Sequence, residues 1–146
     1  MEQARKQLKI YSIALLIYTL ASMAQVAFGL WFGDFDGALI PEGAPENLLL
    51  IAKIAVAVIA LLLCIPQVYV GVKGILVAKN PTSSIRHVFW AKILFIIAIF
   101  GIVFAIVDLF FPGNTSDEIG NVLSLAVDVF IYYDYIKYAT IVAREA

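Results

Sequence analysis

Four long apolar stretches dominate this sequence: Ile10–Phe32, Leu48–Val77, Val88–Phe111 and Ile119–Val142. Each reaches the roughly 20 residues that an α-helix needs to cross about 30 Å of hydrocarbon. A membrane β-barrel would instead need many short segments of alternating polarity. The stretches therefore predict an all-α integral membrane protein, with one transmembrane domain over residues 1–146 and spans at about 10–32, 48–77, 88–111 and 119–142.

The composition agrees with a chain that is surrounded by lipid. Apolar residues make up 63% of it and charged residues only 14%, whereas a soluble domain has about half and about a quarter. The net charge of −1 provides no basic surface for nucleic acid, so no nucleic-acid partner is expected. The single cysteine, Cys64, excludes an intramolecular disulfide and a site with several cysteine ligands.

The distribution of basic residues predicts the orientation. The expected loops 33–47 and 112–118 contain no Lys or Arg. Positive-inside reasoning therefore places these loops outside, and it places the link 78–87 and both termini in the cytoplasm of a multi-pass protein of the cell membrane. The basic residues that carry this argument precede the first span, surround the middle link or follow the last span: Arg5, Lys6, Lys9, Lys73, Lys79, Arg86, Lys137 and Arg144.

The first 24 residues also resemble a cleavable signal peptide. They have a basic start, an apolar run and the small-x-small site Ser22-Met23-Ala24. The apolar run, however, continues to Phe32, which is longer than the usual core of a signal peptide. We therefore expect this segment to remain as the first span.

Small and polar residues recur along each stretch at alternating steps of three and four. This spacing of about 3.5 residues is the contact seam of left-handed helix packing, and short links make consecutive helices antiparallel neighbours. The sequence thus predicts a left-handed, up-down-up-down four-helix bundle with these seams turned inward. The seams are Tyr11, Leu15, Tyr18, Ser22, Gln25 and Gly29; Lys53, Ala57, Ala60, Cys64, Gln67, Gly71 and Gly74; Ser84, His87, Ala91, Leu94, Ala98, Gly101, Ala105 and Asp108; and Asn121, Ser124, Asp128, Ile131, Tyr135 and Tyr138.

Six polar seam residues are expected to converge in the outer half of the bundle. A charge at mid-membrane costs at least about 2.5–3.5 kcal/mol, so it should be paired or hydrated. Lys53 can pair with Asp108 or reach down to Asp128. Two interpretations remain open: an ion pair that fixes helix register, and a functional site that relays protons or binds a polar ligand. The cluster is Lys53, Asp108, Asp128, Gln25, Asn121 and Ser124.

Pro66 and Gln67 form the second candidate feature. Pro66 lies inside the second span and cannot donate a backbone hydrogen bond to Leu62. We expect a kink there, which is either a hinge or an ordinary irregularity of a membrane helix. His87, the single histidine, is expected at the membrane boundary as a surface residue and not as a metal ligand.

No catalytic or cofactor motif is present, and no metal or cofactor is predicted. The favoured function is a non-enzymatic bundle or a subunit of a membrane assembly. The alternative is a small transporter, channel or proton-linked carrier that uses the polar cluster; a membrane enzyme is the weakest reading, because a nucleophile with its base is missing. The expected partners are the lipid bilayer and either a second copy or another membrane protein, which would contact the lipid-facing helix surfaces or the acidic segment 34–46.

Overall fold

The computed structural model describes residues 2–32, 43, 45–110 and 116–146, with side chains omitted at 116–118. Within these residues there are four α-helices: α1 (Glu2–Phe32), α3 (Glu46–Lys79), α4 (Arg86–Leu109) and α5 (Ser116–Glu145). All four are long and apolar enough to cross a membrane. The prediction of an all-α protein with four membrane-length helices is therefore confirmed. Most residues of the two expected outer loops, 33–47 and 112–118, lie outside the described ranges.

Proline sets the boundary between α3 and α4. The residue before a proline is disfavoured in helical geometry, and Asn80, which precedes Pro81, has the extended angles φ −122° and ψ 92°. Its backbone N–H still donates to the carbonyl of Leu76 at 2.8 Å. Inside α3, by contrast, the helix continues through Pro66 without interruption, so the hinge remains a prediction.

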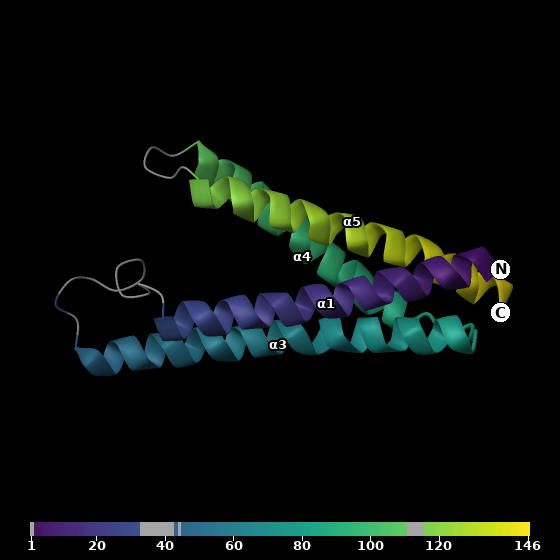
Figure 1. The fold of residues 1–146 in the computed structure, drawn as a ribbon, viewed down its shortest axis with the longest axis horizontal. Coiled ribbons are helices and arrows are strands. Elements are labelled where there is room, and N and C mark those ends of the chain that lie inside the picture. The colour runs from purple at the N-terminus through teal and green to yellow at the C-terminus, as the bar shows by residue number, and fades with distance from the viewer. Residues whose placement is uncertain (1, 33–42, 44, 111–115) are drawn as a thin grey trace.

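The four helices form two pairs that meet at one end of the molecule and diverge towards the other (Figure 1). One pair is α1 with α3, and the other is α4 with α5. The N-terminus and the C-terminus both lie at the end where the pairs meet, which we call the joined end. There the guanidinium of Arg5 donates to the carbonyls of Ala78 and Lys79 and ties the start of α1 to the end of α3.

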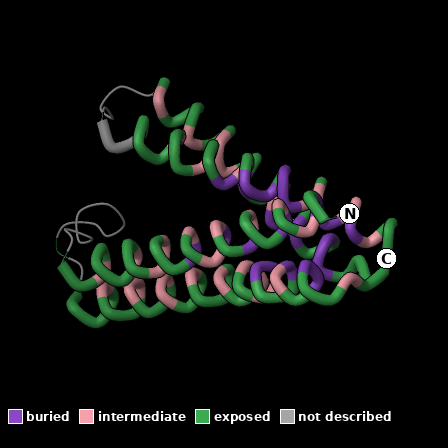
Figure 2. Tube along the Cα trace, turned by 45° about the vertical axis from the view of Figure 1, so that its right-hand side comes forward, coloured by how far each residue is buried: buried purple, intermediate pink, exposed green. Residues whose placement is uncertain are grey.

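The buried core occupies only the half of the molecule next to the joined end (Figure 2). Burial stops at Thr19 in α1, Val70 in α3, Ala98 in α4 and Asp128 in α5; no residue described beyond these positions, away from the joined end, is buried. We call this level the vertex. The helix segments beyond it are the first arm (residues 20–32 and 46–66) and the second arm (residues 99–109 and 119–127).

Aromatic and small residues fill the core. Tyr132 and Tyr135 are the largest side chains that are fully buried, and the hydroxyl of Tyr135 donates to the carbonyl of Val70 at 2.9 Å. Gly71 and Gly74 are buried in α3. A methyl group at Gly74 would collide with Ser12 and the ring of Tyr135, so glycine permits the close approach of α3 to α1 and α5.

The seams expected from the sequence are buried only in part on the joined side of the vertex. In α1 the buried neighbours of Leu15 are Ser12 and Thr19, whereas the expected seam residues Tyr11 and Tyr18 are half-buried. In α4, His87, Ala91, Leu94 and Ala98 are buried, which confirms that part of the prediction. The expectation of a surface position for His87 is wrong, because that residue is only 3% exposed. Its imidazole packs edge-on against the ring of Tyr135, with ring centroids 6.2 Å apart.

Candidate functional site at the vertex

The structure does not gather the six residues of the expected polar cluster into one buried group. Asp128 is buried, Lys53 is half-buried, and Asp108, Gln25 and Asn121 are exposed. Convergence of the six residues would require all four helices to stay in contact over their full length. Because the helix pairs diverge beyond the vertex, residues at the same depth on different arms are separated.

Asp128 lies where α5 enters the core. It is 8% exposed, and its Oδ1 atom has no hydrogen-bond partner within the part of the chain that the structure describes. The position is twelve residues from the start of α5, which corresponds to about 18 Å along the helix. A carboxyl group is thus buried at about the middle of a segment long enough to span a bilayer.

Tyr132 follows Asp128 by one turn of α5, so both side chains lie on the same face. Tyr132 is 1% exposed, and its hydroxyl, like Oδ1 of Asp128, is buried without a hydrogen-bond partner among the residues described. Tyr132 was not among the residues selected from the sequence. Its spacing of four from Asp128 was the available signal.

Residue Tyr18 of α1 connects this level to α5. Its hydroxyl lies 2.8 Å from the hydroxyl of Ser124, one turn before Asp128. The neighbouring Thr19 connects α1 to α3, because its hydroxyl donates to Oε1 of Gln67 at 3.1 Å. Ser124 and Gln67, both selected from the sequence, therefore make polar contacts between helices at the vertex.

Two hydrogen-bonded pairs and two side chains with an unpartnered oxygen among the described residues thus lie at the level of the vertex. We call these six residues the vertex cluster: Tyr18, Thr19, Gln67, Ser124, Asp128 and Tyr132. It offers a carboxyl group, hydroxyls and an amide, which can exchange protons or bind a polar solute. Across the described ranges, no three His, Cys, Asp or Glu side chains come together in a way that could hold a metal ion.

Comparison with known proteins assigns neither a family nor a function to this chain. No family model, curated protein or solved structure matches the chain.

Proposed function

We propose that this protein is a non-enzymatic subunit of a homo-oligomeric assembly in the cell membrane. Its four helices cross the bilayer in alternating directions, packed with a left-handed twist on the joined side of the vertex. The joined end faces the cytoplasm with both termini. Four helices of membrane-spanning length and apolarity and the distribution of Lys and Arg support this arrangement.

One observation carries the assembly proposal: the seams continue beyond the vertex, where the chain itself covers them only in part. In α4 the buried seam residues up to Ala98 are followed by Gly101 and Ala105, which are only half-buried, and by exposed Asp108. In α3 the buried Gly71 and Gly74 continue the seam that includes half-buried Ala57 and Ala60. Small residues at helical spacing provide close contacts between membrane helices, so a further helical surface is expected on the arms.

A second copy fits these arms for geometric reasons. Each arm is a helix pair with a partly covered seam, and the two arms of one chain offer seams at matching depths. In a twofold dimer, the first arm of one copy can pack against the second arm of its partner, and the same contact is repeated by symmetry. This packing restores four-helix contact beyond the vertex and removes Gln25 and Asn121, both exposed, from contact with lipid.

Cysteine cross-linking between copies tests the assembly. Ala57→Cys and Ala105→Cys are each made in a Cys64→Ser background, carried on two differently tagged chains and expressed together in membranes. We expect a disulfide-linked heterodimer, because each position lies on a seam beyond the vertex. The matched controls are Ile59→Cys and Val103→Cys, which lie on the opposite helix faces and are 57% and 51% exposed.

The proposal predicts efficient cross-linking for the seam pair and little for the control pair. Equal cross-linking of both pairs would indicate random collision and would contradict it. The double variant Ala57→Cys/Ala105→Cys on one chain provides the second readout. If its cysteines join only within the monomer, the two arms close on each other and the assembly proposal is wrong.

The vertex cluster supports a second candidate function, a small carrier, channel or proton-linked transporter. The buried Oδ1 of Asp128 and the hydroxyl of Tyr132 lack partners among the residues described and lie where the arms begin to diverge. A polar solute or proton that entered between the arms would meet these groups. Flux into liposomes should then be lost in Asp128→Asn and retained in Asp108→Asn, whereas no flux above protein-free liposomes would contradict transport.

A further inference from the structure

A polar pocket lies at the joined end, separate from the vertex cluster. It has a volume of about 430 Å³, within the usual range for ligand sites, and it is formed by the end of α3, the link to α4 and the first residues of α4. Its charged lining residues are Lys73 and Arg86, and no acidic side chain from the described part of the chain lines it. The pocket therefore favours an anion.

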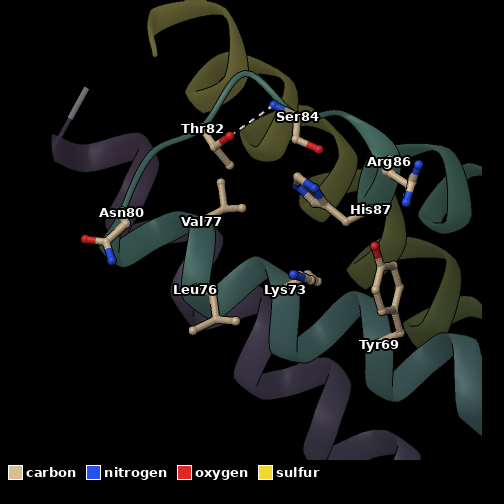
Figure 3. A pocket seen from close by; sticks show the side chains of 9 residues that line it. All are labelled: Tyr69, Lys73, Leu76, Val77, Asn80, Thr82, Ser84, Arg86 and His87. Carbon is tan, nitrogen blue, oxygen red and sulfur yellow. Dashed lines mark hydrogen bonds between the residues drawn. The ribbon is translucent and has the colours of Figure 1, made fainter.

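His87 provides the observation that points to a ligand. It lines the pocket and is 3% exposed, yet its Nε2 atom has no hydrogen-bond partner within the described chain. Figure 3 shows Lys73, His87 and the hydroxyl of Tyr69 around one space. In the tautomer that carries hydrogen on Nε2, the imidazole can donate to an anionic oxygen. A buried donor without a partner is costly, so a ligand that accepts from it would stabilise the site.

An apolar groove adjoins this pocket. It is lined by Leu62, Ile65, Pro66 and Trp90, and it shares Tyr69 and Arg86 with the polar pocket. From Lys73 to Leu62 the path along α3 covers eleven residues, or about 16 Å, and it runs away from the joined end into the membrane. A charged recess that continues into an apolar groove matches a molecule with an anionic head and a hydrocarbon chain.

We infer that the joined end binds a phosphate-bearing lipid. Lys73, Arg86 and His87 hold the phosphate, and one acyl chain lies in the groove beside Trp90. Basic pockets between membrane helices on the cytoplasmic side are a recognised form of lipid headgroup site. A phosphate monoester, as in phosphatidic acid, suits two cations and a neutral donor better than the zwitterionic headgroup of phosphatidylcholine does.

Fluorescence of Trp90 provides a direct test. The sequence has two tryptophans, and the Trp31→Phe variant leaves Trp90 as the single tryptophan, which is excited selectively at the red edge of its absorption. The delipidated full-length protein in detergent is titrated with phosphatidic acid that carries brominated acyl chains, which quench a tryptophan in contact with them. Phosphatidylcholine with the same brominated chains is the comparison. We expect phosphatidic acid to quench at a concentration lower by about fivefold or more, from the contribution of a cation near a lipid phosphate.

Variants locate the binding site. Lys73→Gln should weaken quenching by phosphatidic acid about fivefold, and His87→Gln should also weaken it. Lys79→Gln removes the same charge from the last turn of the same helix but lies outside the pocket, so it should change the midpoint by less than about twofold. Lys73 is exposed, so this test does not depend on a substitution in the core.

Three results would overturn the inference. Equal quenching by the two lipids would show that the groove accepts an acyl chain whatever the headgroup. Equal loss of quenching in Lys73→Gln and Lys79→Gln would show that phosphatidic acid responds only to the overall positive charge of the joined end. The third contrary result would be displacement of phosphatidic acid from the wild-type protein by inorganic phosphate at millimolar concentration. It would assign the pocket to a free anion. Retained quenching in the presence of inorganic phosphate supports the lipid.

Discussion

Three buried polar atoms lack hydrogen-bond partners in the described parts of the chain: Oδ1 of Asp128, the hydroxyl of Tyr132 and Nε2 of His87. They lie at two levels, the vertex and the joined end. Such groups normally have partners in folded proteins. These atoms lie at the two ends of the packed half, and the apolar core lies between them. We therefore expect water, a ligand or a partner to contact the molecule at these two levels.

At the residue scale, Asp128→Leu should stabilise the protein. Removal of a buried carboxyl oxygen without a partner relieves a desolvation penalty of about 1–3 kcal/mol, and leucine has a similar size. Asp108→Leu is the matched control, because Asp108 is exposed and its replacement should change stability by less than about 0.5 kcal/mol. The measurement is the unfolding free energy in detergent. A marked loss of stability in Asp128→Leu would show that this carboxylate has a stabilising partner.

Sequence reasoning identified Asp128 but not its surroundings. Its burial could be predicted because a charge on the seam of an apolar helix has few other places to lie. Asp108 was misplaced because depth alone does not fix which helix faces it. His87 received two conflicting expectations, a place on the inward seam and a surface position, because it sits at the first turn of α4, where hydropathy does not distinguish a buried boundary residue from a surface one.

At the element scale, Gly71 and Gly74 determine how closely α3 approaches α1. A Cβ atom at Gly71 would lie 2.6 Å from Cγ of Leu16, and one at Gly74 would collide with Ser12 and Tyr135. Contacts this close are not accommodated without a shift of the helix or of its neighbours. The glycines therefore hold the first helix pair against α5 at the joined side of the vertex.

We expect Gly74→Ala to destabilise the fold by about 1–3 kcal/mol, because it overpacks this contact. Gly29→Ala is the control: it is also helical, and nothing lies within 4 Å of the place that its new methyl group would take. There the change should be neutral or should stabilise by up to about 1 kcal/mol, since alanine favours the helix. The midpoint of thermal unfolding, measured for both variants in the same detergent, distinguishes destabilisation at Gly74 from a neutral or stabilising change at Gly29. Equal effects would contradict a packing role for Gly74.

The helices and the seam of α4 were readable from the sequence because both depend on spacing within one helix. In α1 the buried Ser12 and Thr19 each lie one position after the expected Tyr11 and Tyr18. The buried residues of α4 follow the predicted order from His87 to Ala98. The divergence of the helix pairs was not readable, since the seams of α3 and α4 keep the same spacing on both sides of the vertex. The spacing of residues within one helix predicts a seam. It does not predict which part of that seam another helix of the same chain covers, because this depends on the tertiary arrangement.

At the scale of the whole molecule, the proposed orientation puts the joined end in the cytoplasm. Single cysteines in a Cys64→Ser background test it, at Ser83 in the link, Arg144 near the C-terminus and Glu46 at the start of α3, all exposed positions. In intact cells, a membrane-impermeant thiol reagent should label Glu46→Cys and spare Ser83→Cys and Arg144→Cys. Lysed cells provide the control, because all three should then react. The reverse pattern would show that the chain inserts the other way round.

Packing that is confined to one end turns each arm into a lever. From Asp128 to the start of α5 the second arm extends over about 18 Å, so a rotation of about 10° at the vertex moves its tip by about 3 Å by simple geometry. Substitutions that resize side chains around Thr19 or Tyr132 should therefore be magnified at the outer surface. A cysteine pair near the tips would report such small changes more sensitively than any distance measured within the core.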